Sequence, residues 1–474
     1  MTGCQSGLQH APPIRVPPSV FPGKWSCTAL SELKGPIDVS LPPFARVQDV
    51  HMAAGDGGQV GIVWRREVDD DSLDWDPTIE RFRVRKTDLT LARSSQELLP
   101  PAEPELVGRK MPPMDREVFA QDEFVAMAVI GPEAVEGYQL FGGYPPDCGW
   151  TDPMQDVGYA DGRWYAVFNL YPSKDAQHDD GGIALAKFDA SGWSKPTVVV
   201  PKECAHPIWS FSEGTRVELF WAEEYLPFLA FPDSGLERQR VKHAAIEPGR
   251  EGKVQTVYEC PMLRLLGFAW NDWVIRAVRL EPNRYELLVE RHYWGLLREL
   301  RAELRHVANV LSAWPTSSGA LGRYWGFGGC VAVVLPGRRL QVIWDEDPEG
   351  GCGRPGRLTY RIMEVHYDGR SWSAPREIAQ PSHVSRYSLA ATAVQAGDLS
   401  AVLVVWQDEG EHLVYAVGSG SGQWSRPVTT SLVVGERIWL AGAGDTVTLL
   451  TEIDRNLRWC RLLLTPADSA TQAE

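Results

Sequence analysis

The chain has 474 residues, among them 47 Lys and Arg and 62 Asp and Glu, and a formal net charge of −15. This acidic balance excludes nucleic acid as an expected partner, since a phosphate backbone is bound by clustered Lys and Arg. No apolar run reaches the roughly 18 residues of a membrane-spanning helix. The 19 Trp, 44 Gly and 35 Pro are typical of many short strands joined by turns.

The N-terminal sequence Thr2-Gly3-Cys4 resembles the end of a bacterial lipobox, in which Cys4 would be the lipidated residue. The charged and apolar regions of a signal peptide do not precede it, so the alternative is a chance match. Residues 5–22 are polar and rich in Pro, which is typical of a flexible tether. We therefore expect residues 1–22 to be a tether and the protein to be extracytoplasmic, in the periplasm or at the cell surface.

A strand that ends in Trp and is followed by acids recurs along the chain. Each copy follows a turn that contains Gly, as the second strand of a hairpin does. The preceding strand also repeats, because Gln48-Asp49-Val50 and Gln155-Asp156-Val157 share the same three residues. The four Trp-acid copies lie at residues 60–67, 217–224, 340–347 and 402–409.

A third element is the phrase Trp-Ser-x-Pro, which occurs after a turn at Trp193, Trp372 and Trp424. One unit therefore consists of four antiparallel strands, with the Trp-Ser-x-Pro phrase opening the last of them. The second and third phrases are 52 residues apart. Four-stranded units at this spacing predict an all-β fold, a β-propeller.

The units predict blades at 47–110, 152–200, 204–262, 265–316, 320–380 and 383–431. Residues 434–465 hold only three strands, and the phrase Gly23-Lys24-Trp25-Ser26 supplies the missing fourth. We expect seven blades, with six or eight as alternatives, in a ring closed by strands from both termini. The single domain would span 23–466, with a flexible tail at 467–474. Segment 111–151 fits no blade and is predicted to be an insertion or a degenerate blade.

Two further expectations concern local structure. Leu297, Leu300, Leu304, Val307 and Leu311 recur every three or four residues, which favours a helix inserted in the fourth blade over two strands. The closing sheet would bring Cys27 near Cys460, where a disulfide would lock the ring. No CxxC spacing links the eight Cys, so no zinc site is predicted.

The turn phrases resemble the Asp-box of the sialidase-like propeller superfamily, whose pattern is Ser/Thr-x-Asp-x-Gly-x-x-Trp. Asp368 with Trp372 is the closest copy and Asp189 with Trp193 is the next, whereas the copy at Trp424 has no Asp. The resemblance covers residues 150–430. It implies that these residues are structural, that the Asp caps backbone N–H groups and that the Trp packs between blades. It also implies that the turns lie on the face opposite the ligand site.

The catalytic residues of sialidases have few counterparts here. Ile14-Arg15-Val16-Pro17 is a near match to their Arg-Ile-Pro motif. No set of three arginines and no Tyr–Glu nucleophile pair can be assigned, so the resemblance does not extend to sialidase activity itself.

The predicted topology gathers acids on the face opposite the turn phrases. Such an acidic funnel would disfavour anionic sugars and suit neutral glycans, cationic ligands or calcium. Asp49 and Asp156 are the candidate catalytic pair, since glycoside hydrolysis uses two carboxylates. The other candidate ligand-binding residues are His51, Asp69, Asp70, Asp71, Glu223, Glu224, Asp345, Asp347 and Asp408. The alternative is that these acids are solvated loop charges.

Two functions remain open at this point. The first is recognition of a glycan at the funnel, with or without its hydrolysis. The second is a non-catalytic envelope lipoprotein that uses one face of the propeller to bind another protein. In both cases we expect a monomer, calcium as the only candidate cofactor, and a membrane contact only through Cys4.

Overall fold

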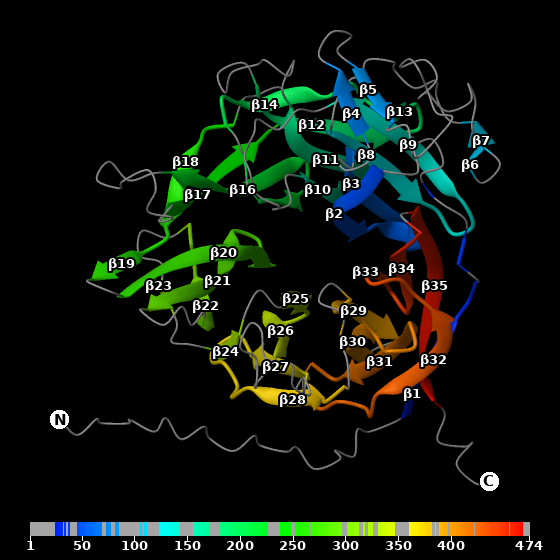
Figure 1. Ribbon diagram of the computed structural model, residues 1–474, viewed down its shortest axis with the longest axis vertical. Helices are drawn as coiled ribbons and strands as arrows, with labels where there is room; N and C mark the ends of the chain where they lie inside the picture. Colours follow the sequence, from blue (N-terminus) through cyan, green and yellow to red (C-terminus); the bar gives the residue numbers. More distant parts are fainter. Residues whose placement is uncertain are drawn as a thin grey trace.

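The computed structural model is a ring of seven antiparallel β-sheets arranged around a central axis (Figure 1). This confirms the predicted seven-bladed propeller of four-stranded blades. The structure describes residues 24–31, 33–34, 37, 45–68, 73–76, 81–84, 105–106, 109–110, 123–142, 155–170, 181–203, 205, 207–225, 238–247, 252–265, 268–295, 301–311, 316–317, 321–325, 330–346, 360–381, 384, 388–396, 399–420, 422–454 and 456–467.

The first three blades each run from the inside of the ring outwards in chain order. Blade one contains β2 (Ala45–Ala54), β3 (Val60–Val68), β8 (Glu123–Ile130) and β9 (Val135–Gly142). Blade two contains β10 (Gln155–Ala160), β11 (Arg163–Leu170) and β12 (Gly182–Asp189), with an outer edge formed by β13 (Gly192–Trp193) and β14 (Thr197–Pro201). Blade three contains β15 (Ile208–Glu213), β16 (Arg216–Tyr225), β17 (Arg238–Ile246) and β18 (Gln255–Glu259).

Blade four is the largest sheet, with β19 (Met262–Leu265), β20 (Phe268–Glu281), β21 (Arg284–Gly295), β22 (Arg301–Ala308), β23 (Thr316–Ser317) and β24 (Gly322–Trp325). Blade five contains β25 (Cys330–Leu335), β26 (Arg339–Glu346), β27 (Arg361–Tyr367) and β28 (Arg376–Ala379). Blade six contains β29 (Ala390–Ala396), β30 (Leu399–Gln407), β31 (His412–Gly418) and β32 (Val428–Val433).

Blade seven combines the two ends of the chain. Its inner strands are β33 (Ile438–Ala443), β34 (Thr446–Ile453) and β35 (Asn456–Ala467), and its outer strand is β1 (Lys24–Ala29). The register sets Lys24 opposite Ala467 and Ala29 opposite Leu462. The predicted closure by strands from both termini is therefore confirmed.

Blade one differs from its predicted boundaries. Its third and fourth strands lie within residues 123–142, in the segment that was expected to be an insertion. The insertion instead separates β3 from β8 and includes two short hairpins, β4 (Leu73–Asp76) with β5 (Arg81–Val84) and β6 (Glu105–Leu106) with β7 (Arg109–Lys110).

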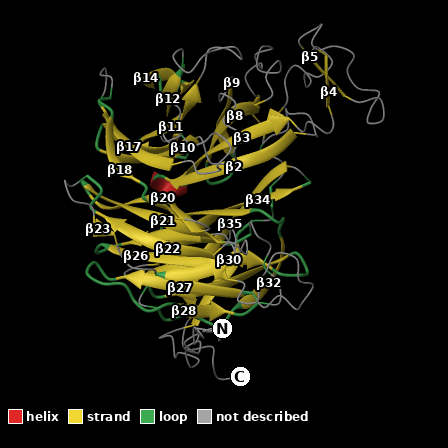
Figure 2. Ribbon diagram, turned by 60° about the vertical axis from the view of Figure 1, so that its left-hand side comes forward, coloured by secondary structure: helices red, strands yellow, loops and turns green. Residues whose placement is uncertain are grey.

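The predicted helix at residues 297–311 is wrong, because residues 301–308 form strand β22. Leu304 packs against blade five and Val307 packs against blade three, so they lie on opposite faces of one strand. A propeller strand is buried on both faces, and a spacing of three between apolar residues is then compatible with a strand. In the described part of the chain, the only helix is the single 3₁₀ turn η1 (Asp56–Gly58), seen in Figure 2. No described helix is long and apolar enough to span a membrane.

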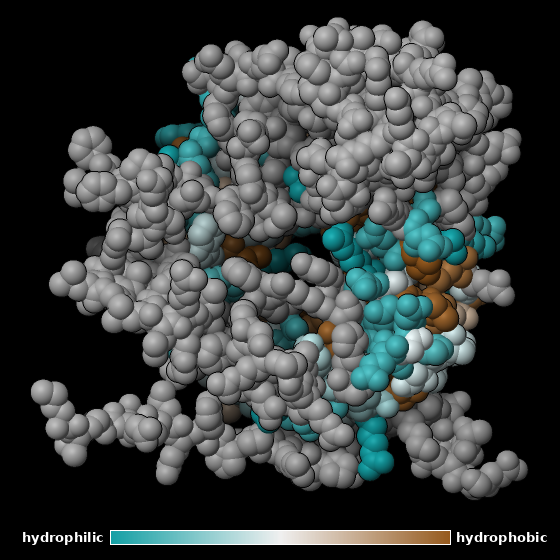
Figure 3. Space-filling model, viewed as in Figure 1, coloured by the Kyte–Doolittle hydropathy of each residue, from teal (hydrophilic) through white to brown (hydrophobic). Residues whose placement is uncertain are grey.

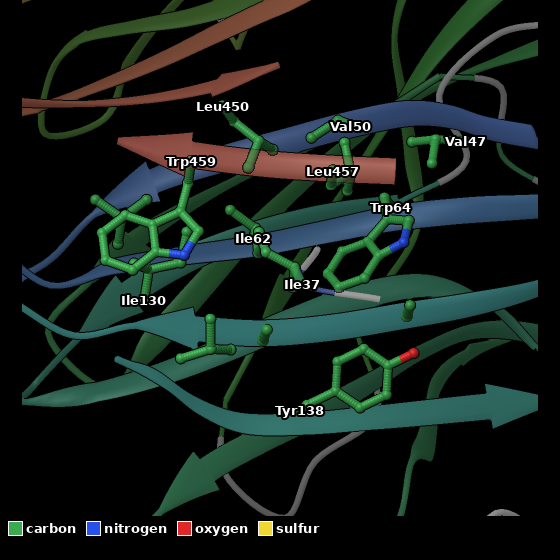
Figure 4. Close-up of a cluster of buried hydrophobic side chains, with 14 of the residues drawn as sticks. Ile37, Val47, Val50, Ile62, Trp64, Ile130, Tyr138, Leu450, Leu457 and Trp459 are labelled. Carbon is green, nitrogen blue, oxygen red and sulfur yellow. The ribbon is translucent and has the colours of Figure 1, made fainter. Parts of the chain in front are cut away.

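The seam between blades seven and one has its own hydrophobic core (Figure 4). The indoles of Trp64 and Trp459 are fully buried there, and the ring centroids of Tyr138 and Trp64 lie 5.9 Å apart. Ile37, which follows β1, is also fully buried and donates its backbone N–H to Leu457 O at 2.9 Å. The chain between the closing strand and the first blade thus seals the seam that it crosses.

The expected Cys27–Cys460 disulfide is not formed, and both residues are free thiols. The register explains this, because Cys27 lies opposite Leu464 rather than Cys460. Burial raises the pKa of both thiols to about 12. Packing and strand pairing, without a covalent bond, therefore hold the ring closed.

The Trp-Ser-x-Pro phrase has a defined structural role. At all three sites the Ser hydroxyl accepts the backbone N–H of a residue in the third strand, at 3.0 Å, while the Ser N–H donates back to the carbonyl of that same residue. The pairs are Ser194 with Lys187, Ser373 with His366 and Ser425 with Val417. The hydroxyl thus satisfies a ladder N–H where the outer strand bends away.

The Trp of the phrase connects neighbouring blades. Trp193 Nε1 donates to Gly137 O of blade one at 2.5 Å, and Trp372 Nε1 donates to His306 Nδ1 of blade four at 3.2 Å. Gly137 has φ +59° and a Cβ there would lie 2.1 Å from the Phe188 ring, so only Gly allows this contact. The acids of the same turns cap the backbone, as Asp368 Oδ1 accepts the N–H groups of Arg370 and Ser371 at 2.8 Å.

Replacing Ser425 by Ala should lower the free energy of unfolding by about 1 kcal/mol, because the N–H of Val417 loses its acceptor. Urea unfolding followed by Trp fluorescence measures the change. Ser431→Ala, on the exposed part of β32, is the control and should stay within about 0.5 kcal/mol of wild type. Equal losses in the two variants would contradict the role assigned to the Ser hydroxyl.

Candidate functional site

The two faces of the ring differ in which loops they carry. First strands begin and second strands end at one face, called here the upper face. The turns from first to second strands and the Trp-Ser-x-Pro turns lie at the lower face. Of the described candidate residues, Asp156, Glu223 and Asp345 lie toward the upper ends of their strands, whereas His51 is the seventh of the ten residues of β2.

Asp156 connects the innermost strands of three successive blades. Its Oδ1 lies 3.0 Å from His51 Nδ1 on β2 and accepts the N–H of Val157 at 2.9 Å. Its Oδ2 accepts both the N–H and the hydroxyl of Ser210 on β15, at 2.6 and 2.8 Å. We call His51, Asp156 and Ser210 the inner-strand network.

This geometry does not match the catalytic role considered for Asp156. A nucleophile or general base needs an oxygen that faces the reacting atom, whereas both oxygens of Asp156 are occupied by protein donors. Asp156 is also the central residue of the network, so Ser210 contacts the carboxylate and not the imidazole. A Ser-His-Asp triad requires the hydroxyl to contact the imidazole.

The network instead fixes the imidazole of His51. Its side chain is 11% exposed and that of Asp156 is 15% exposed, so water and a ligand can still reach both residues. A carboxylate on Nδ1 orients the ring and selects the tautomer that carries its proton on that nitrogen. His51 is therefore a rigidly held polar group within β2, the innermost strand of blade one.

Glu223 lies in an ion-pair cluster at the top of blade three. Lys242 Nζ contacts Glu223 Oε2 at 3.0 Å and both oxygens of Glu203 at 2.8 and 2.7 Å. Arg240 also donates to Glu223. Burial raises the pKa of Glu223, but hydrogen bonds from Arg240 and Lys242 outweigh it and hold this pKa below its usual value. Two carboxylates and two cations make the cluster formally neutral.

Blade four contains further buried charged residues, which were not among the site residues predicted from the sequence. Arg291 binds Asp272 with two hydrogen bonds of 2.6 and 2.8 Å, and Asp272 is 2% exposed. Arg305 binds Glu303 at 3.0 Å on the same face of the blade. Asp272 and Arg291 lie on different strands, so no short spacing in the sequence could have revealed their pairing, whereas Glu303 and Arg305 are two residues apart on β22.

The remaining acids have diverse roles. Asp408 caps its hairpin, since Oδ1 accepts the N–H groups of Gly410 and His412 at 2.9 Å. This fits the alternative of a turn cap better than ligand binding. Asp345 is half-buried on β26, at the upper end of blade five. Asp69, Asp70, Asp71 and Asp347, the side chains of Asp49 and Glu224, and Cys4 lie outside what the structure describes.

A second set of buried charges, which was not predicted from the sequence, lies nearer the lower face. Glu218 Oε2 contacts His243 Nε2 at 2.6 Å, and Glu286 bonds His306, the acceptor of the Trp372 indole. Both Glu residues follow an Arg by two positions, at Arg216 and Arg284. This repeated Arg-x-Glu pattern was available in the sequence and would have identified the pairs as part of the scaffold.

Family models and curated proteins provide no match to this chain. Among solved structures, the Hadza microbial sialidase Hz136 has 10% identity and a TM-score of 0.42, covering 92% of this chain and 96% of that chain. The GH93 α-L-arabinofuranosidase of Fusarium graminearum in complex with arabinobiose has 7% identity and a TM-score of 0.42, with coverages of 91% and 98%. Trypanosoma rangeli sialidase in complex with 2,3-difluorosialic acid has 8% identity and a TM-score of 0.38, with coverages of 93% and 58%.

Replacing Asp156 by Ala should lower the free energy of unfolding by about 2–4 kcal/mol, because it leaves the half-buried donors of Ser210 and His51 without their charged acceptor. Chemical denaturation measures the loss. Asp445→Ala, an exposed acid bonded to the Thr446 hydroxyl, is the control and should change stability by less than about 1 kcal/mol. An Asp156 variant as stable as wild type would show that the network does not stabilise the packing between blades.

Glu223 also gives a prediction about pH. A carboxyl with a lowered folded-state pKa stabilises the fold above its unfolded value near 4.5, and this contribution is lost as pH falls through the folded-state pKa. Glu223→Gln should therefore flatten the decline of the melting temperature below pH 4.5. Identical slopes in variant and wild type would show that Arg240 and Lys242 do not stabilise the carboxylate.

Proposed function

We propose that this propeller recognises a neutral glycan at the upper ends of the innermost strands of blades one to four. The observation that carries the proposal is the inner-strand network. It holds His51, Asp156 and Ser210 in fixed positions on three adjacent blades, half-buried and within reach of a ligand. Ligand sites are typically hollows with a few convergent polar groups, and prior ordering lowers the entropy lost on binding.

Blade four supplies further groups that suit a sugar. Trp273, next to Asp272 on the innermost strand β20, is half-buried, and Arg276 of the same strand is exposed. An indole offers an apolar platform, and a guanidinium offers several donors to hydroxyl groups. Sugar hydroxyls need both donors and acceptors, which His51 and Ser210 can provide.

Pairing among the described charges supports a neutral ligand. Glu223 and Asp272 are compensated by Lys242, Arg240 and Arg291, so the upper ends of blades three and four are less acidic than the sequence suggested. A site without strong net charge has no electrostatic preference for an anionic or a cationic ligand. The proposal concerns recognition, and it assigns no hydrolytic step to Asp156.

A glycan array probed with purified protein tests the proposal. We expect specific binding that His51→Ala weakens by about tenfold or more, the effect of losing one oriented hydrogen bond in a site. His412→Ala, a half-exposed histidine of blade six, is the matched control and should bind like wild type.

Two results would contradict the proposal. One is no glycan binding by the folded wild-type protein. The other is binding that His51→Ala leaves unchanged while circular dichroism shows an intact fold. A chromogenic glycoside panel run alongside, with Asp49→Ala, tests whether recognition is accompanied by hydrolysis.

A further inference from the structure

Arg461, at the seam between blades seven and one, is a buried cation. It lies on β35 opposite Thr448 and is 8% exposed. No described carboxylate lies within ion-pair distance of its guanidinium. Burial lowers the pKa of Arg461, which is the direction expected for a cation without a compensating charge.

The partners of the Arg461 side chain are few. Nη2 donates to Gly131 O at 2.8 Å, in the turn between β8 and β9 of blade one. Nε is fully buried and has no hydrogen-bond partner. Glu136 packs beside Gly131 and Asp56 accepts the Tyr159 hydroxyl, and neither acid forms an ion pair with Arg461.

The turn at η1 lies close to the guanidinium of Arg461. Gly58 has φ +74°, and a Cβ there would approach Arg461 Nη1 to 3.3 Å. Gly57 has φ +64°, and a Cβ there would meet no atom within 4 Å, so open space lies beside the turn. The glycine at position 58 thus keeps side-chain atoms away from Nη1.

A buried charge without a partner is costly, and native proteins compensate such groups with a counter-charge, water or an ion. A guanidinium presents its donors in a planar fork that suits oxyanions and other small anions. We propose that Arg461 binds a small inorganic anion in the seam between the blade-seven strand β35 and the blade-one turns at Gly58 and Gly131.

Binding there would have a structural consequence. An anion that binds only the folded ring stabilises it by mass action. Because Arg461 bridges the last and first blades, occupancy of this site would strengthen ring closure in particular. This effect is independent of the proposed glycan site, because the turn at Gly58 joins a first strand to a second strand and so lies at the lower face.

The test compares melting temperatures in sodium chloride, sulfate and phosphate at constant ionic strength, with sodium gluconate as the reference salt. Wild type should be stabilised in a saturable way by at least one of the small anions. Arg461→Met should lose that saturable part, corresponding to at least roughly tenfold weaker binding. Arg458→Met, on the same strand with Asp454 at 3.9 Å, is the matched control and should keep it.

General salt effects on stability would act equally on all three proteins, and equal responses would overturn the proposal. If Arg461→Met fails to fold, a bromide soak of wild-type crystals decides the question. An anomalous peak beside the Arg461 guanidinium supports the site, and its absence at a bromide concentration that stabilises the protein refutes it.

Discussion

Closure of the ring depends on pairing between β1 and β35, which come from opposite ends of the chain. Without β1, strand β35 would expose an unpaired edge, and the core around Trp64 and Trp459 would lose the covering segment at Ile37. Every other blade packs between two neighbours, so a gap at this seam would leave two blades with an exposed face. The described surface beside the seam mixes hydrophilic and hydrophobic residues (Figure 3).

Repeated residues have a different role in this ring from residues that occur once. The repeated Ser residues satisfy the backbone, and Trp193 and Trp372 bind their blades to the preceding ones. In the described part of the ring, the inner-strand network occurs once, linking blades one, two and three, and breaks the symmetry of the ring. A ligand site must also break that symmetry, which is why the proposed glycan site centres on His51 and Asp156.

The scaffold was predictable from the sequence because its determinants are local. Trp-Ser-x-Pro marks the outer strands of blades two, five and six, and the Gly23 to Ser26 phrase identified the closing strand. Local spacing was misleading where burial on both faces of β22 produced a helical period at Leu304 and Val307.

Local spacing also did not predict the roles of the acids. Asp408 and Glu223 occupy similar sequence contexts, yet one caps its own turn and the other depends on Lys242 and Arg240 from another strand. The partners of Asp156 lie 105 and 54 residues away, a distance that only the folded ring makes short.

A crystal structure of the protein with an oligosaccharide bound would locate the ligand independently of any variant. We expect density for the sugar at the upper face, with a hydroxyl group within hydrogen-bond distance of His51 or Ser210. Density among the Trp-Ser-x-Pro turns of the lower face, or on the outer edges of the blades, would contradict it.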